Sequence, residues 1–286
     1  MISDITLGQF FPGFSLLHKL DPRTKLLSAI LFIVAIFMAK TTLAFLLLAV
    51  FTVSLIFVSR ISFSVILRGI RPVIYILIFT SLLNIFMTKG VGDPLVSFWV
   101  IKIYQEGIIR AVFMTVRVTL LIIGSSLLLT YTTSPISLTD GLESLLSPLA
   151  KIGVPVHVFS MMMTIALRFI PTLVEETDKI MNAQKSRGAD FTSGSLVRRA
   201  KALIPILVPL FVSAFKRAEE LAIAMECRCY RVDKKRTKLV KLTFRAKDFL
   251  SLLVFAIFLA GIILISRMPA TMLGGSYVAR LLCYRI

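Results

Sequence analysis

The sequence has little acidic charge and few residues of the types that build metal or disulfide sites. Asp and Glu together number 15 against 33 Lys and Arg, and the chain has three cysteines and two histidines. Cys227 and Cys229 lie in the most basic stretch and Cys283 near the end, which gives no disulfide framework, and Cys-x-Cys with so few histidines is a poor metal site. We therefore expect reduced cysteines and no bound metal.

The motifs of common catalytic sites are also missing. The chain has no Gly-x-x-x-x-Gly-Lys-Ser/Thr phosphate loop, no His-Glu-x-x-His and no Gly-x-Ser-x-Gly. Its long apolar runs contain no Asp or Glu, whereas carriers driven by protons or sodium use such carboxylates on the ion path. We predict a non-catalytic chain with no cofactor of its own, whose work is mechanical and whose energy comes from a partner.

Apolar residues dominate what is present. Of 286 residues 57% are hydrophobic and 17% charged, with a mean hydropathy of +0.89. A soluble domain could not carry this composition, so we predict an all-α integral membrane protein. The net charge of +18 would suggest nucleic acid in a soluble protein. Here the basic residues cluster between apolar runs, which indicates membrane topology instead.

The apolar runs predict about five transmembrane helices. Residues 26–58 would measure roughly 50 Å as one helix, beyond a hydrocarbon core of about 30 Å. We divide them at Lys40 into two short spans. The other spans are expected at about 72–87, 108–130 and 249–265.

Positive charge sets the expected orientation, because basic loops stay in the cytoplasm. The loop before the third span carries three arginines and the N-terminal flank three basic residues, whereas residues 89–102 contain only Lys89 and Lys102. The N-terminus is therefore predicted to be cytoplasmic.

Residues 134–247 hold most of the basic charge and predict three cytoplasmic helices. The first is expected at about 139–150, and two long ones at about 156–187 and 195–228. In each long helix the first half is apolar and the second half polar. This pattern is expected of a helix that runs along the underside of the membrane and acts as a lever. A competing interpretation places the apolar halves in the membrane as further spans or a re-entrant pair, although they are short for that.

The expected organisation is thus four transmembrane helices in 1–133, coupling helices in 134–247 and a last transmembrane helix in 248–267. Residues 268–286 form a tail that could be an expression remnant.

Several segments follow one family pattern in order. They are Leu20-Asp21-Pro22-Arg23-Thr24-Lys25, Leu146-Ser147-Pro148-Leu149, Gly153-Val154-Pro155, Arg168-Phe169-Ile170-Pro171, Glu175-Glu176, Ala183-Gln184-Lys185-Ser186-Arg187-Gly188 and Cys227-Arg228-Cys229-Tyr230. This ordered set resembles the transmembrane T subunit of energy-coupling factor (ECF) transporters, the family that also includes the cobalt-transport permease. The set spans most of residues 18–230.

The resemblance implies a coupling subunit in a bacterial or archaeal cell membrane. Such a subunit holds two ABC-type ATPases, which bind ATP and Mg, and a small membrane-embedded S component, which captures a vitamin or metal ion. Closure of the ATPases would move the long helices and tip the S component. A dedicated cobalt or nickel permease is the alternative within transport, and a membrane-bound lipid-modifying enzyme is the alternative of another class.

The resemblance also implies roles for individual residues. Arg187 and Arg228, with their neighbours Ser186, Gly188, Cys227 and Cys229, would dock the ATPases. The family often has Ala where Ser186 stands, and Ala and Gly where the two cysteines stand. Without the resemblance, each arginine could equally complement a helix dipole.

Two further groups of residues complete the predicted site. Arg168, Pro171, Glu175 and Glu176 are expected to support the coupling helices. Arg168 and the two glutamates lie on one face at helical spacing, and Pro171 is expected to kink the helix. Met161, Met162 and Met163 are either core filler or a flexible surface for the S component.

Overall fold

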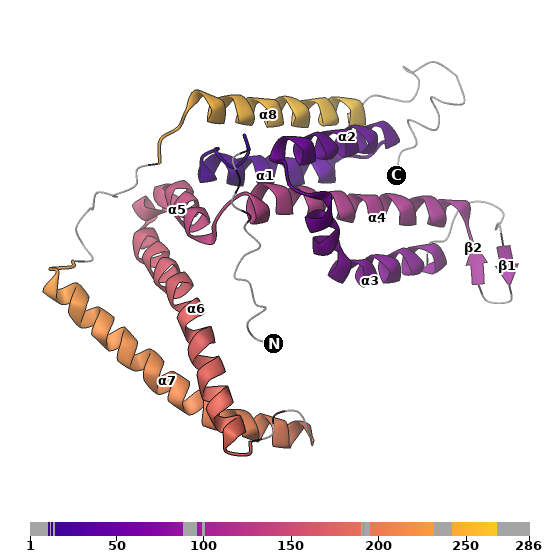
Figure 1. Ribbon diagram of the computed structural model, residues 1–286. Helices are drawn as coiled ribbons and strands as arrows, with labels where there is room; N and C mark the ends of the chain where they lie inside the picture. The colour runs from indigo at the N-terminus through magenta and orange to yellow at the C-terminus, as the bar shows by residue number, and fades with distance from the viewer. Residues whose placement is uncertain are drawn as a thin grey trace, which may run out of the picture. The chain divides into compact units, whose positions relative to one another are not determined.

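The computed structural model describes residues 11, 13, 15–87, 96–98, 101–189, 191, 195–231 and 242–267. Eight α-helices lie in these residues (Figure 1): α1 (Pro22–Met38), α2 (Thr42–Ser59), α3 (Phe63–Met87), α4 (Gln105–Ser125), α5 (Pro135–Leu146), α6 (Val156–Ser186), α7 (Leu196–Cys227) and α8 (Ala246–Arg267). A π-helix, η1 (Ser126–Tyr131), extends α4, and a 3₁₀-helix, η2 (Ser147–Ile152), follows α5. The prediction of an all-α protein is confirmed, with one short antiparallel hairpin, β1 (Val96–Phe98) and β2 (Ile101–Ile103), beside the helices.

The described residues divide into two compact units. Residues 142–231 form what we call the α6/α7 unit, and residues 11–141 together with 242–267 form the main unit. The chain therefore leaves the main unit once and returns once.

Aromatic and aliphatic side chains fill the core of the main unit. Helix α1 packs against α8 and α4, and its Phe32 is fully buried. A Cβ atom at Gly124 of α4 would collide with the Phe32 ring, so glycine permits this close approach. Phe51 of α2 stacks on Phe258 of α8 at 3.9 Å between ring centroids and meets Phe255 edge-on at 5.3 Å. These contacts hold α1, α2, α4 and α8 together.

Much of the apolar surface of the main unit is exposed, as a bilayer requires. Tyr75 and Phe79 of α3 and Phe249 of α8 are among the most exposed side chains. Five described helices are long and apolar enough to span a membrane: α2, α3, α4 with η1, α6 and α8. The predicted number is confirmed, but the set differs, because α6 qualifies with 31 residues and α1 has 17, the lower limit for a span.

Two predicted boundaries were wrong. Helix α3 begins at Phe63, not near Pro72, because the helix continues through residues 63–71, where Arg68 and Arg71 suggested a loop. The first coupling helix begins at Pro135, not Thr139. Ser134 caps it by accepting from the Ser137 N–H at 3.2 Å, and Pro135 takes the first position, where its missing N–H costs nothing.

Candidate coupling site

The end of α6 places Arg187 where the helix stops and the chain turns. Gly188 has φ +84°, in the left-handed region, and its N–H donates to the Lys185 carbonyl at 2.9 Å. The Ala189 N–H donates to the Gln184 carbonyl at 3.0 Å. This pair of bonds is the Schellman cap, and it leaves the Arg187 side chain exposed at the helix end.

The end of α7 has the same cap around Arg228. Cys229 has φ +54°, and its N–H donates to the Glu226 carbonyl at 2.8 Å. The Tyr230 N–H donates to the Met225 carbonyl at 2.9 Å. The Arg228 side chain is exposed, like that of Arg187.

The two arginines therefore occupy equivalent positions at the ends of two helices of similar length. Each is the last residue before a left-handed one, and each follows an exposed residue, Ser186 in α6 and Cys227 in α7. The Ser186 hydroxyl donates within its own helix to the Asn182 carbonyl at 3.1 Å, so it supports the helix end. The two motifs, which are similar in sequence, therefore also have the same backbone conformation.

The left-handed residue at the end of α7 is cysteine where the end of α6 has glycine, which predicts local strain. A side chain in this region costs about 1 to 2 kcal/mol, whereas glycine enters it freely. We expect Cys229→Gly to slow hydrogen exchange of the last turn of α7 about threefold to fivefold, measured by mass spectrometry on the intact protein.

Cys227→Gly is the matched control, because Cys227 is helical and glycine there removes helix propensity. Its exchange should become faster. Faster exchange in Cys229→Gly as well would contradict the assignment of strain to residue 229.

Away from the helix ends, an ion pair joins the two helices of this unit. Arg217 of α7 donates from Nη2 to Glu176 Oε2 of α6 at 3.0 Å, and its Nε lies 3.5 Å from the Ser213 hydroxyl. Arg187 follows Glu176 by 11 positions and Arg228 follows Arg217 by 11 positions. At about 1.5 Å per residue, each arginine lies about 16 Å along its helix beyond the ion pair.

The structure brings together only part of the predicted support group. Glu176 reaches α7, while Arg168 and Glu175 lie exposed on α6, and α6 continues through Pro171. Sequence reasoning missed Arg217. A signal was present in the sequence: Glu176 and Arg217 are 41 positions apart, which equals the separation of Arg187 and Arg228.

An exposed apolar stripe runs along the first part of α7. We call it the α7 apolar face, and its members recur at helical spacing: Ile204, Leu207, Val208, Phe211, Val212 and Phe215. Phe215 is 72% exposed. On α6, Met162 and Met163 are exposed and Met161 is partly buried, so the methionine cluster is not core filler throughout. Sequence reasoning noted the apolar half of α7 without assigning it a contact.

Another polar contact of the α6/α7 unit lies at the start of α6. His157 Nδ1 lies 3.1 Å from Glu143 Oε1 of α5. This contact ties the first turn of α6 to the end of α5, so it fixes the base of the helix that ends at Arg187.

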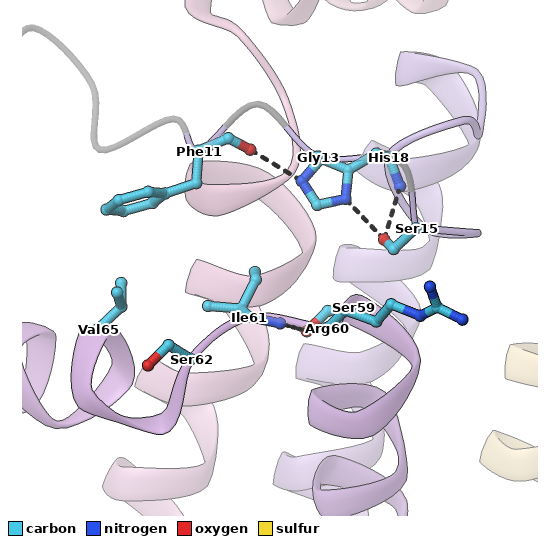
Figure 2. Close-up of a pocket in the computed structure, with 9 residues that line it drawn as sticks. All are labelled: Phe11, Gly13, Ser15, His18, Ser59, Arg60, Ile61, Ser62 and Val65. Atoms are coloured by element: carbon cyan, nitrogen blue, oxygen red, sulfur yellow. Dashed lines mark hydrogen bonds between the residues drawn. The ribbon is translucent and has the colours of Figure 1, made fainter.

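The main unit has a separate cavity of about 370 Å³ beside the turn between α2 and α3 (Figure 2). The His18 imidazole lies at its edge, with Nδ1 2.6 Å from the Ser15 hydroxyl and Nε2 2.9 Å from the Phe11 carbonyl. Both ring nitrogens of His18 therefore lie within hydrogen-bond distance of a neighbouring oxygen. Among the residues with described placement, no group of three or more His, Cys, Asp or Glu could hold a metal ion.

Comparisons with known proteins agree on one family. The sequence pattern of the CbiQ family, described as "Cobalt transport protein", matches residues 13–239. The "Energy-coupling factor transporter transmembrane protein EcfT" of Clostridium kluyveri is 52% identical over 93% of this chain and 98% of its own length. The proteins of the same name from Brevibacillus brevis and Bacillus subtilis are 56% and 48% identical, over 87% and 93% of this chain and 93% and 100% of their own lengths.

Proposed function

Since the chain belongs to the CbiQ family and to the EcfT transmembrane proteins of ECF transporters within it, we propose that it couples ATPase motion to substrate uptake. The chain is a non-catalytic, multi-pass membrane subunit that binds no cofactor itself. In the proposed complex two ABC-type ATPases bind ATP and Mg, and an S component captures a vitamin or metal ion. The N-terminus is proposed to be cytoplasmic, in a bacterial or archaeal cell membrane.

The equivalent ends of α6 and α7 carry this proposal. Two copies of one kind of ATPase would present two copies of one binding groove, and the chain offers two arginines in the same cap conformation. A guanidinium exposed at a helix end can enter an acidic groove and make paired, directional hydrogen bonds. Equal lengths of helix extend from the Glu176–Arg217 pair to the two arginines, so each ATPase would act on its helix at the same distance from the pair.

The α7 apolar face and the exposed methionines of α6 are the proposed contact with the S component. An apolar stripe on a helix suits a membrane-embedded partner, and flexible methionines suit partners that differ in shape. The substrate would then be chosen by the S component, which agrees with the absence of acidic residues in the predicted spans.

Copurification tests the proposal. A tagged chain coexpressed with ATPase and S-component subunits should bring both down in mild detergent, and Phe211→Glu with Phe215→Glu should lower S-component recovery about tenfold. Placing two charges in a desolvated apolar contact removes more than the 1.4 kcal/mol that a tenfold change requires. ATPase recovery should stay unchanged.

Ala218→Glu and Ala222→Glu together form the control, because both are exposed positions further along α7, outside the apolar face. They should leave both recoveries as in the wild type. A wild-type chain that recovers no ATPase subunit would overturn the proposed function, and equal S-component loss in the control would remove the assignment of the contact.

A dedicated cobalt or nickel permease is the second candidate, because the matched family is described by cobalt transport. The two candidates share the docking ends of α6 and α7. They differ in whether one fixed capture partner or several different ones copurify with the chain.

A further inference from the structure

The first motif of the family pattern, residues 20–25, lies far along the chain from the docking arginines and has no role in the coupling contacts above. It begins α1 in the main unit. The Asp21 side chain caps this helix by accepting from the Arg23 N–H at 2.9 Å, and Pro22 occupies the first helical position. A cap alone requires only Asp21, so the rest of the motif needs another explanation.

A buried carboxylate joins the start of α1 to the start of α8. Asp248 is 2% exposed. Its Oδ1 accepts from the Asp21 N–H at 2.8 Å, and its Oδ2 accepts from the Arg245 N–H at 2.8 Å. One side chain therefore closes the first turn of α8 and holds the chain that precedes α1.

A buried ammonium group joins α1 to the end of η1. Lys25 is 3% exposed, and its Nζ donates to the Thr132 carbonyl at 2.7 Å and to the His18 carbonyl at 3.3 Å. It also interacts electrostatically with Asp21 and Asp248. The π-helix η1 ends just before Thr132, and π-helical turns are frequent at functional sites.

Helix α5 reaches the same motif through Gly141. A Cβ atom at this position would lie 2.9 Å from Pro22 Cβ, 3.2 Å from the Pro22 carbonyl carbon and 3.3 Å from the Arg23 nitrogen. Two of these three atoms are backbone and cannot rotate away, so only glycine allows α5 to pass so close to the start of α1.

These contacts surround the two points where the chain leaves and re-enters the main unit. The chain passes into the α6/α7 unit after Gly141, and it has returned to the main unit by residue 242, shortly before Arg245 and Asp248. We infer that Asp21, Lys25, Gly141 and Asp248 form a clasp that fixes both connections, so that movement of α6 and α7 is transmitted to the membrane helices instead of being lost at the connections. This inference rests on the proposed coupling function and makes Lys25 and Asp248 positioning residues.

The chemistry of the clasp favours this role over simple stabilisation. Burying charged groups carries a desolvation cost that well-packed apolar residues avoid, so buried ions are a poor means of adding stability. Hydrogen bonds from fixed backbone groups to one carboxylate are directional, and they hold α1 and α8 in one geometry.

The test uses the whole complex, with ATPase and S-component subunits, reconstituted in liposomes. Asp248→Asn, Lys25→Met and Gly141→Ala should each lower uptake about tenfold while ATP hydrolysis stays within about threefold of wild type. Losing a buried charged group leaves its backbone partners without a matching hydrogen bond, and a side chain at residue 141 forces a backbone contact, so each change displaces the connections. Lys247→Met, at an exposed neighbour of Asp248, is the control and should leave both rates unchanged.

Both rates are expressed per amount of purified complex, and the ratio of ATP hydrolysed to substrate transported is the readout. A raised ratio in all three variants supports the clasp, including Gly141→Ala, which changes no charge. An unchanged ratio, whether both rates persist or fall together, would overturn it and leave a motif that only stabilises the fold. A wild-type complex without bound ATPases would instead refute the proposed function.

Discussion

Replacing both Arg187 and Arg228 with alanine is expected to lower uptake to below about one-hundredth of wild type, with ATPase copurification reduced as well. Truncating a guanidinium desolvated in an acidic groove leaves partner carboxylates unpaired, a loss on the order of 2 to 5 kcal/mol for each contact. Uptake in cells and ATPase recovery in mild detergent measure the two effects.

Two further sets of variants distinguish docking by the arginines from a general effect of positive charge on the helices. Lysine at either position should rescue poorly, because it keeps the charge and loses the planar fork. Lys201→Ala with Lys216→Ala removes two exposed charges from α7 without touching either helix end, and should leave uptake within about twofold of wild type, as expected for solvated charges. If the arginine double variant kept full uptake and full complex yield, the arginines would only complement the helix ends.

Reversing either charge of the Glu176–Arg217 pair is expected to lower uptake about tenfold, and reversing both should restore it to within about threefold. A partly exposed pair adds only about 0.2 to 1 kcal/mol to stability, so truncation should matter little. Two like charges at this contact repel each other, and the repulsion would change the angle between the helices whose far ends are proposed to hold the ATPases. Uptake by Glu176→Arg, Arg217→Glu and the double variant is the measurement.

Glu175→Arg is the matched control for this pair, because Glu175 is the adjacent residue and is exposed. It should change uptake by less than twofold. Equal damage from Glu175→Arg, or no recovery in the double reversal, would show that the pair does not set the geometry of the two helices.

The long helices could be predicted from sequence because their signals are local. Helix α6 was predicted to end at Arg187 and ends at Ser186, since Gly188 is a strong terminator. The division of residues 26–58 followed from length and from Lys40, and α1 and α2 separate there. The predicted start of α5 was wrong because two possible capping residues lie close together in the sequence. The helix begins after Ser134, with Pro135 as its first residue, and the Thr139 hydroxyl donates within the helix to the Pro135 carbonyl at 2.9 Å.

By itself, the sequence determined the membrane character, the two long helices and the arginines at their ends, because hydropathy, helix caps and ordered motifs act over a few residues. Only the tertiary structure decided that Glu176 pairs with Arg217 of α7, and that Cys229 takes the left-handed conformation that Gly188 also has. It alone placed Asp248 against Asp21, 227 positions away in the chain. Such contacts depend on how whole helices pack, and packing leaves no local pattern when the partners are far apart in sequence.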